Sequence, residues 1–180
     1  MKARVHHLQG LRHRAGFAIW PWVIILVMIT SVVLLLQYAH QNLANANQCR
    51  LQMKHIYGAL GLYEVENGAL PDLLYYPDRP KESVKSLVVA LVQQYGLNEA
   101  DCVCPKAHPL IKEKGLSYIW NVNLNNQALV SGSQAEWMLG EIQMLSTKLV
   151  GPHFRNYHVV YTDGHVKRID KAPHEIPGIR

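Results

Sequence analysis

Residues 17–36 read FAIWPWVIILVMITSVVLLL, twenty positions without a charged side chain. A helix of about 20 residues spans the hydrocarbon core of a bilayer, so the run predicts a transmembrane helix over 17–37. Four basic side chains precede it (Lys2, Arg4, Arg12 and Arg14), and no acidic residue occurs before Glu64. By the positive-inside rule, the N-terminus is expected in the cytoplasm, the helix in an inner membrane as a single pass, and the C-terminal head in the periplasm or outside the cell.

Two other interpretations of this run stay open at this point. A cleaved secretory signal usually has an apolar core of about 7–15 residues, which is shorter than this run, but Ala44-x-Ala46 offers a cleavage site. The second alternative is a soluble cytoplasmic protein that buries this helix in its own core.

The positive charge is confined to the N-terminal third. Residues 1–63 hold six basic and no acidic side chains, a net +6, whereas residues 64–180 hold 12 basic and 13 acidic side chains, a net −1, which together give the +5 of the chain. A nucleic-acid-binding head would need clustered basic residues. The distribution therefore predicts no nucleic-acid partner.

The apolar run continues into a second helical pattern. In CRLQMKHIYGALGLYEVENG, residues 49–68, apolar side chains recur every three or four positions, as on one face of a helix; they are Met53, Ile56, Tyr57, Leu60 and Tyr63. Gly68 and Pro71 provide a stop signal. We therefore expect one helix from residue 17 to about 67, which would be about 75 Å long.

Shorter elements follow. Residues 82–96 predict a second helix with a buried stripe, formed by Val84, Leu87, Val88, Leu91 and Val92. The segments 115–122, 127–132 and 136–143 have the composition of strands, and Asp163-Gly164 between 157–162 and 165–169 predicts a β-hairpin with a two-residue type I′ turn. The expected fold class is α+β. Its predicted parts are a cytoplasmic leader (1–16), the transmembrane helix (17–37), an exported helical continuation (38–70), a globular head (71–172) and a tail (173–180).

Ten histidines invite a search for a site, and three of them lie in residues 151–170. In a two-residue hairpin, Thr162 pairs with His165 and His158 pairs with Ile169. His158 and His165 then share the solvent face but stand about 13 Å apart, and only a fold-back could bring His153 to either. The interpretation is that these histidines are exposed or satisfied, with no metal ion and no cofactor.

Catalytic motifs give no further signal, since the chain contains no G-x-S-x-G, H-E-x-x-H or phosphate-binding loop. The sequence therefore predicts no enzyme. An exported metal-dependent enzyme that uses His153, His158, Asp163 and His165 stays open as an alternative.

Three cysteines, Cys49, Cys102 and Cys104, are expected on the exported side. An oxidising compartment favours one disulfide and one spare thiol. The alternative is a zinc site that would combine the three thiolates with a histidine, although C-x-C departs from the usual C-x₂₋₄-C spacing.

Several motifs, in order, resemble one family. RAGF at 14–17 is similar to the cleavage site of type IV prepilins and type II secretion pseudopilins. Residues 49–71 are similar to the second half of the long pilin helix. His153, nine residues and then Asp163-Gly164 match the H-X9-DG signature of one pilin-like subgroup, and Cys104-Pro105 and SYIWN at 117–121 also resemble elements of that subgroup.

The resemblance implies a pilin-like fold and a non-enzymatic, structural function in a type II secretion or type IV pilus-like machine. It implies cleavage between Gly16 and Phe17 by a prepilin peptidase, assembly with other pseudopilins through the helix that starts at Phe17, and a disulfide between Cys49 and Cys104. The chain departs from the family at Pro21, where the family usually has a glutamate that pairs with a neighbouring N-terminal amine. A membrane-anchored binding domain that does not polymerise is therefore the alternative.

Overall fold

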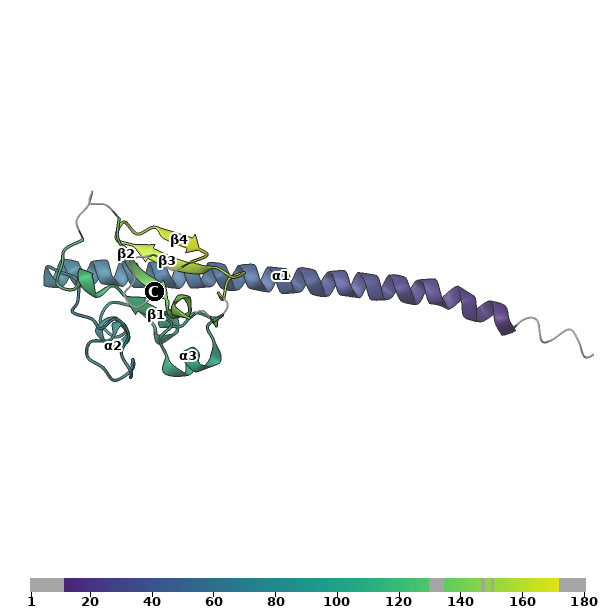
Figure 1. Cartoon of the computed structure of the whole chain (residues 1–180), viewed down its shortest axis with the longest axis horizontal. Coiled ribbons are helices and arrows are strands. Elements are labelled where there is room, and N and C mark those ends of the chain that lie inside the picture. Colours follow the sequence, from purple (N-terminus) through teal and green to yellow (C-terminus); the bar gives the residue numbers. More distant parts are fainter. Residues whose placement is uncertain (1–11, 130–134, 147, 150, 172–180) are drawn as a thin grey trace, which may run out of the picture. The chain divides into compact units, whose positions relative to one another are not determined.

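The structure, a computed structural model, describes residues 12–129, 135–146, 148–149 and 151–171 (Figure 1), with side chains from residue 19 onward. The chain forms two compact units, Met1–Gln41 and Asn42–Arg180.

Helix α1, Arg12–Asn67, runs from the first unit into the second as a single helix of 56 residues with Pro21 inside it (Figure 1). This confirms the helix predicted from residue 17 to about 67, but α1 begins five residues earlier. Pro21 therefore lies in the helix interior, where it lacks the N–H that would donate to the carbonyl four residues before it. The helix ends as predicted at Gly68, whose φ of 79° is the left-handed conformation that glycine adopts readily, and whose N–H donates to the Glu64 carbonyl over 2.7 Å.

The first unit presents apolar side chains to its surroundings. Every side chain described from Ile19 to Leu36 is exposed, including Trp20, Trp22 and Leu35 at 68%, 72% and 68%. Within the described residues, the helix from Ile19 to Asn67 is the single helix long and apolar enough to cross a membrane. The prediction of a membrane-spanning candidate at this end of the chain is confirmed by length and composition.

In the second unit, α1 buries one stripe and forms one side of the core. Cys49, Met53, Ile56 and Leu60 are each fully buried, and their spacing of three and four residues places them on one helical face. Leu62, two residues after Leu60 and so on another face of the helix, is 58% exposed. The head is therefore built directly against the C-terminal part of α1.

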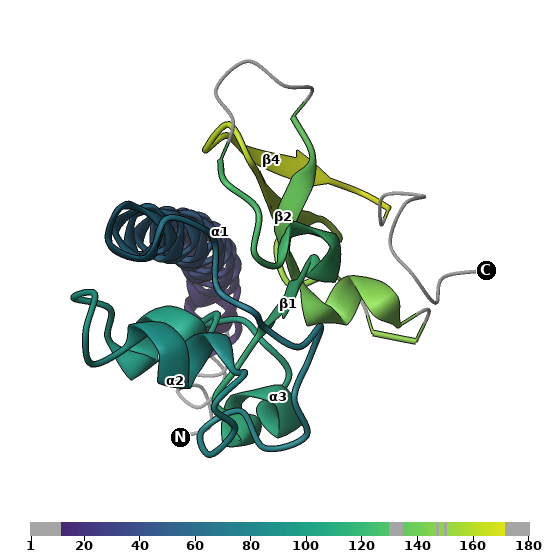
Figure 2. The same ribbon diagram turned by 90° about the vertical axis from the view of Figure 1, so that its left-hand side faces the viewer.

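The rest of the core is an antiparallel sheet in the order β1-β2-β3-β4. Its strands are β1 (Tyr118–Trp120), β2 (Trp137–Glu141), β3 (Tyr157–Tyr161) and β4 (Val166–Ile169). In Figure 2 the two short helices α2 (Leu87–Leu91) and α3 (Pro109–Lys114) lie on the side of the head away from β4. The described residues also form three 3₁₀ helices, at Glu99–Cys102, Val122–Leu124 and Ile142–Leu145.

Both faces of the sheet are covered. The first face packs on α1, through Tyr118, Trp120, Met138, Leu139 and Val160. The second face packs on other segments, through Ile119, Trp137, Tyr157 and Val159 with Tyr75 and Ile142. The pairing of β2 with β3 shifts by one residue between Trp137 and Leu139, which explains why the neighbours Met138 and Leu139 both lie on the α1 face.

The second helix is shorter than predicted. Residues 82–86 form turns, and α2 starts only after Ser86, whose side chain accepts a hydrogen bond from the Val88 N–H. Val84, which was assigned to the buried stripe, is 80% exposed. Helix α3 was missed, although Pro109 at its first position and Gly115 (φ 79°) after its end are recognisable boundary signals. Residues 127–129 are not a strand, and 130–132 lie outside the described residues.

The hairpin exists, but the predicted two-residue turn is wrong. Val160 pairs with Val166 and His158 with Arg168, one position away from the predicted register. The Gly164 N–H donates to the Tyr161 carbonyl over 2.9 Å, and Gly164 alone in the loop has a positive φ, 78°. These are the marks of a three-residue loop in which glycine forms the bulge.

Candidate metal centre

Four potential metal ligands from distant parts of the sequence meet between α1 and the sheet. We call Cys49, Glu141, His153 and His158 the Cys-Glu-His cluster. One ligand atom from each lies within 4.8 Å of the others. Their residues are 0%, 2%, 2% and 5% exposed, so the cluster is enclosed by protein.

Sheet register places two members of the cluster. Glu141, the last residue of β2, pairs with Tyr118, and the preceding Gly140 pairs with Val159. Antiparallel pairing therefore brings Glu141 beside His158. Because alternate residues of a strand share a face, Glu141 lies on the side of Leu139, and His158 on the side of Val160. Both belong to the face that packs on α1, where Cys49 lies.

His153 reaches the cluster through a tight turn before β3. Its backbone forms a bridge with Asn156, in which each N–H donates to the other residue's carbonyl over 3.3 and 3.1 Å. The two residues between them, Phe154 and Arg155, have φ values of 53° and 66°, which are uncommon for non-glycine residues. A Cβ on Gly151 would come within 2.7 Å of the Arg155 and Asn156 backbones. The turn is therefore the fold-back that the sequence alone did not predict.

Glu141 is the centre of the cluster. Its Oε1 accepts from the Cys49 thiol over 2.9 Å, and it lies 2.9 Å from His153 Nε2 and 3.4 Å from His158 Nδ1. The two imidazole rings pack against each other, with centroids 4.5 Å apart. Three polar contacts therefore converge on a single carboxylate oxygen.

Two buried polar atoms of the cluster have no hydrogen-bond partner among the described residues, Glu141 Oε2 and His153 Nδ1. A buried polar atom without a partner costs roughly 1–3 kcal/mol. The hydrogen bonds of the described residues thus leave the cluster incompletely satisfied.

Other polar side chains surround the cluster. Cys104 Sγ lies 3.3 Å from His153 Nε2, and the Tyr118 hydroxyl lies 3.5 Å from Cys49 Sγ and donates to Gln52 Oε1 over 3.3 Å. Cys102 is buried and belongs to the apolar core.

Burial and hydrogen bonding oppose each other at the acidic and basic members. Burial alone would raise the pKa of Glu141, but hydrogen bonds with His153 and His158 outweigh it and lower that pKa. Burial alone would lower the pKa of His153, yet hydrogen bonds with Cys104 and Glu141 raise it to about 9. These directions favour a carboxylate at Glu141 and an imidazolium at His153.

The two thiols Cys49 and Cys104 shift each other's pKa in opposite directions. A hydrogen bond with Cys49 is the largest cause that lowers the pKa of Cys104 to about 6, with His153 acting in the same direction against burial. The pKa of Cys49 is raised, first by the hydrogen bond with Cys104 and then by burial. Because a thiol has one proton, Cys49 donates to either Cys104 or Glu141 at one time.

The cysteine predictions have different outcomes. Cys49, Cys102 and Cys104 are all free thiols. Cys49 and Cys104 nevertheless lie close enough for each to shift the pKa of the other, so the pair implied by the resemblance is brought together, and its oxidation to a disulfide stays a prediction. The alternative set of three thiolates and one histidine is not formed, because the cluster contains one cysteine, two histidines and a glutamate.

The histidine interpretation needs correction. His158 is buried, contrary to its expected place on the solvent face, because α1 covers that face, and His153 is buried as well. His165 is exposed and contacts Asp163 at 3.5 Å, so the four-residue set His153, His158, Asp163 and His165 does not form one site. Glu141 was missed. Its signal was weak, a single acidic residue at the end of an otherwise apolar strand.

The remaining signature residues lie elsewhere. Gly16, Phe17 and Pro21 are within α1. Asp163 Oδ1 accepts from the His165 N–H over 2.9 Å, and Gly164 forms the bulge of the loop. Both therefore shape the hairpin turn.

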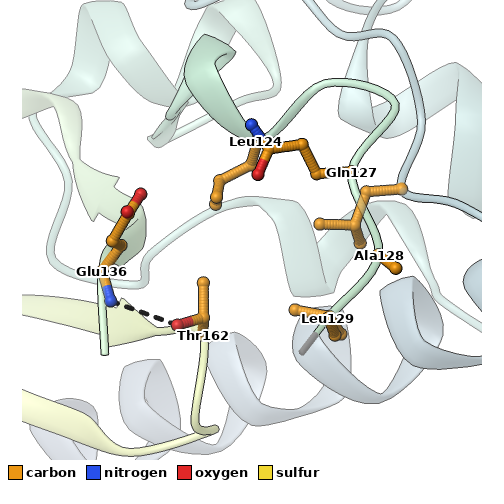
Figure 3. A pocket seen from close by; sticks show the side chains of 7 residues that line it. Leu124, Gln127, Ala128, Leu129, Glu136 and Thr162 are labelled. Carbon is orange, nitrogen blue, oxygen red and sulfur yellow. Dashed lines mark hydrogen bonds between the residues drawn. The ribbon is translucent and has the colours of Figure 1, made fainter. Parts of the chain in front are cut away.

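A shallow cavity of about 160 Å³ lies near the hairpin tip and shares no residue with the cluster. Figure 3 shows Leu124, Gln127, Ala128 and Leu129 facing Glu136 and Thr162 across it. The Glu136 N–H donates to Thr162 Oγ1 over 3.1 Å. Small-molecule sites usually measure about 300–1,000 Å³, so this cavity is too small for such a ligand.

Comparisons of the chain with protein-family models, with curated proteins and with solved structures found no match.

Proposed function

We propose that the chain is a pseudopilin-like structural subunit of a type II secretion or type IV pilus-like machine. It is held in the inner membrane by residues 17–37, with its N-terminus in the cytoplasm and its head in the periplasm or outside the cell. The observation that carries the proposal is α1, a single helix that is apolar and exposed over 19–36 and forms one side of an α+β core from Cys49 to Leu60.

The exposed apolar segment of α1, residues 19–36, needs lipid or another protein to shield it from water. Contiguous apolar patches larger than a few hundred Å² on a protein mark an interface with a membrane or a partner. Lipid covers the helix of an isolated subunit, and the helices of neighbouring subunits cover it in an assembly. Along α1 the exposed apolar residues (19–36) and the core-forming residues (Cys49 to Leu60) fall in separate segments, so one helix can serve both purposes.

A membrane-anchored binding domain that does not polymerise is the second candidate, and Pro21 is the observation that favours it. The resemblance gives the residue at this position a pairing role that needs a carboxylate, and proline has none. The two candidates share the anchor and the head and differ only in contacts between copies or homologous partners.

Crosslinking in the membrane separates these candidates. A photoreactive amino acid is placed at Ile24, which is 57% exposed in the apolar run, and the full chain is irradiated in its native membranes. A pseudopilin gives a ladder of crosslinked subunits, whereas an isolated anchor crosslinks to lipid only. The Pro21→Glu variant is expected to strengthen the ladder.

The matched control carries the same amino acid at Val84, which is 80% exposed on the head. If assembly depends on the apolar helix, the ladder from Ile24 disappears when the chain is diluted into detergent micelles. The Val84 control is expected to give no ladder in the micelles either. Monomers alone from Ile24 in native membranes would overturn the pseudopilin proposal and leave the binding domain.

A further inference from the structure

We propose that the Cys-Glu-His cluster is a structural zinc site, in which Cys49 Sγ, one Glu141 carboxylate oxygen, a His153 nitrogen and a His158 nitrogen coordinate one Zn²⁺. This inference is independent of the proposed function, because it concerns how the head is held together.

The spacing of the donor atoms fits the metal. Zinc bonds of about 2.0–2.3 Å in a tetrahedron separate the ligand atoms by about 3.3–3.8 Å. Around Glu141 Oε1 the distances are 2.9 Å to Cys49 Sγ, 2.9 Å to His153 Nε2 and 3.4 Å to His158 Nδ1, and the whole set lies within 4.8 Å. The two 2.9 Å distances must lengthen by about 0.4 Å, and pairs at the 4.8 Å limit must shorten by about 1 Å, to reach a tetrahedron.

The donor types select the metal. One thiolate, two imidazoles and one carboxylate suit Zn²⁺, while Mg²⁺ and Ca²⁺ prefer oxygen ligands throughout. The dication balances the thiolate of Cys49 and the carboxylate of Glu141, and both imidazoles bind as neutral ligands. A buried site with no net charge avoids the large cost of an unpaired charge in the protein interior.

The unpartnered carboxylate oxygen is the second observation that points to a ligand. Glu141 Oε2 is buried with no partner among the described residues, next to an Oε1 that carries three contacts. A bound metal ion would replace the three contacts of Glu141 Oε1 with one coordinate bond. Either carboxylate oxygen of Glu141 could make that bond.

Burial indicates a structural role. Catalytic zinc sites keep an open position for water or substrate, whereas structural sites are closed by four protein ligands. The four residues here are at most 5% exposed. They come from α1, β2, β3 and the turn before β3, so the ion would tie the helix to the sheet.

Cys104 links this site to the disulfide that the resemblance implies. Its Sγ lies 3.3 Å from His153 Nε2, and it is close enough to Cys49 for the two thiols to shift each other's pKa. As a thiol it can donate a hydrogen bond to a metal-bound Cys49 sulfur, as neighbours of metal ligands do. A Cys49–Cys104 disulfide would remove the thiolate ligand, so the disulfide and the zinc site exclude each other.

Cobalt titration of the full chain in detergent tests the site. The protein is reduced with a phosphine, stripped with a chelator and titrated with Co²⁺, which reports its ligands by colour. We expect one equivalent to give the visible bands of tetrahedral cobalt and a near-ultraviolet thiolate-to-cobalt band, both lost on adding Zn²⁺. Cys49→Ser should abolish the thiolate band, and His158→Asn should weaken cobalt binding at least tenfold.

Two matched variants serve as controls. Cys102→Ser removes a buried cysteine outside the cluster, and His165→Asn removes an exposed histidine of the same hairpin. Both should keep the full spectrum. The proposal is overturned if reduced wild-type protein takes up no cobalt, if its spectrum lacks the thiolate band, or if Cys49→Ser keeps that band.

A measurement on the unaltered chain covers the case in which the cluster variants do not fold. X-ray absorption at the zinc edge should show one sulfur at about 2.3 Å and three nitrogen or oxygen ligands at about 2.0–2.2 Å. Two sulfur ligands would overturn the proposed set by bringing in Cys104. Isolation from native membranes as a metal-free Cys49–Cys104 disulfide would overturn the site in favour of that bond.

Discussion

Gly164 occupies a position where the backbone and the space around it both require glycine. Its φ is 78°, and a Cβ there would lie 3.0 Å from the Tyr57 ring of α1. The Tyr57 hydroxyl also donates to the Thr162 carbonyl over 3.2 Å. The hairpin tip is therefore held against α1, and the Asp-Gly part of the signature has a physical explanation in a turn that rests on the helix.

We expect Gly164→Ala to lower the free energy of unfolding by about 1–2 kcal/mol, because a left-handed conformation costs a non-glycine residue that amount. The Cβ contact with Tyr57 adds to this loss. Gly58→Ala is the matched control, since Gly58 lies inside α1 with nothing within 4 Å of an added Cβ. It should raise stability by up to about 1 kcal/mol through helix propensity. Chemical denaturation of both variants in detergent measures the difference, and equal losses would contradict the explanation.

Helix α1 is the element on which the head depends. Its buried stripe meets β1, β2 and β3, and burying a leucine side chain contributes about 1.5–3 kcal/mol. The sheet itself has strands of only three to five residues, so it cannot be stable without a covering on its inner face.

Leu60→Ala should therefore destabilise the head by about 2–5 kcal/mol, the usual range for a fully buried leucine. Leu62→Ala makes the same chemical change two residues away, where the side chain is 58% exposed, and should change stability by no more than about 0.5 kcal/mol. Thermal unfolding followed by circular dichroism compares them. Similar melting temperatures for the two variants would show that α1 does not form the core.

The sequence predicted the long helix and the hairpin because both have local signals. The period of Met53, Ile56 and Leu60 defines a helical face, and Asp163-Gly164 marks a turn. The length of α2 could not be read, because Ser86 starts the helix at a position that the periodic pattern had already assigned to its interior.

The cluster was beyond local reasoning for two reasons. The turn at Phe154 and Arg155 needs positive φ values at two residue types that do not favour them. The sequence therefore contains no turn signal that predicts the fold-back of His153. His158 was assigned to solvent on the assumption that one sheet face is bare, whereas two separate cores cover the sheet. Glu141 comes close to His153 and His158 only through the pairing of strands that are distant in the sequence.

At the scale of the whole molecule, one chain combines a basic N-terminal end, a bare apolar helix and a head of nearly balanced charge. This distribution suits a protein that keeps its first residues in the cytoplasm and places its head beyond a membrane. The pseudopilin-like function proposed above adds one covalent expectation to this arrangement, the removal of the leader before Phe17.

The mature N-terminus tests this account most directly. The full chain is purified from native membranes, and its first residue is identified by mass spectrometry of terminal peptides. The account predicts a start at Phe17, and a Gly16→Leu variant that stays unprocessed. A start at Met1 would contradict it and leave an uncleaved anchor, and a start at Asn47, after Ala44-x-Ala46, would contradict it in favour of a secretory signal.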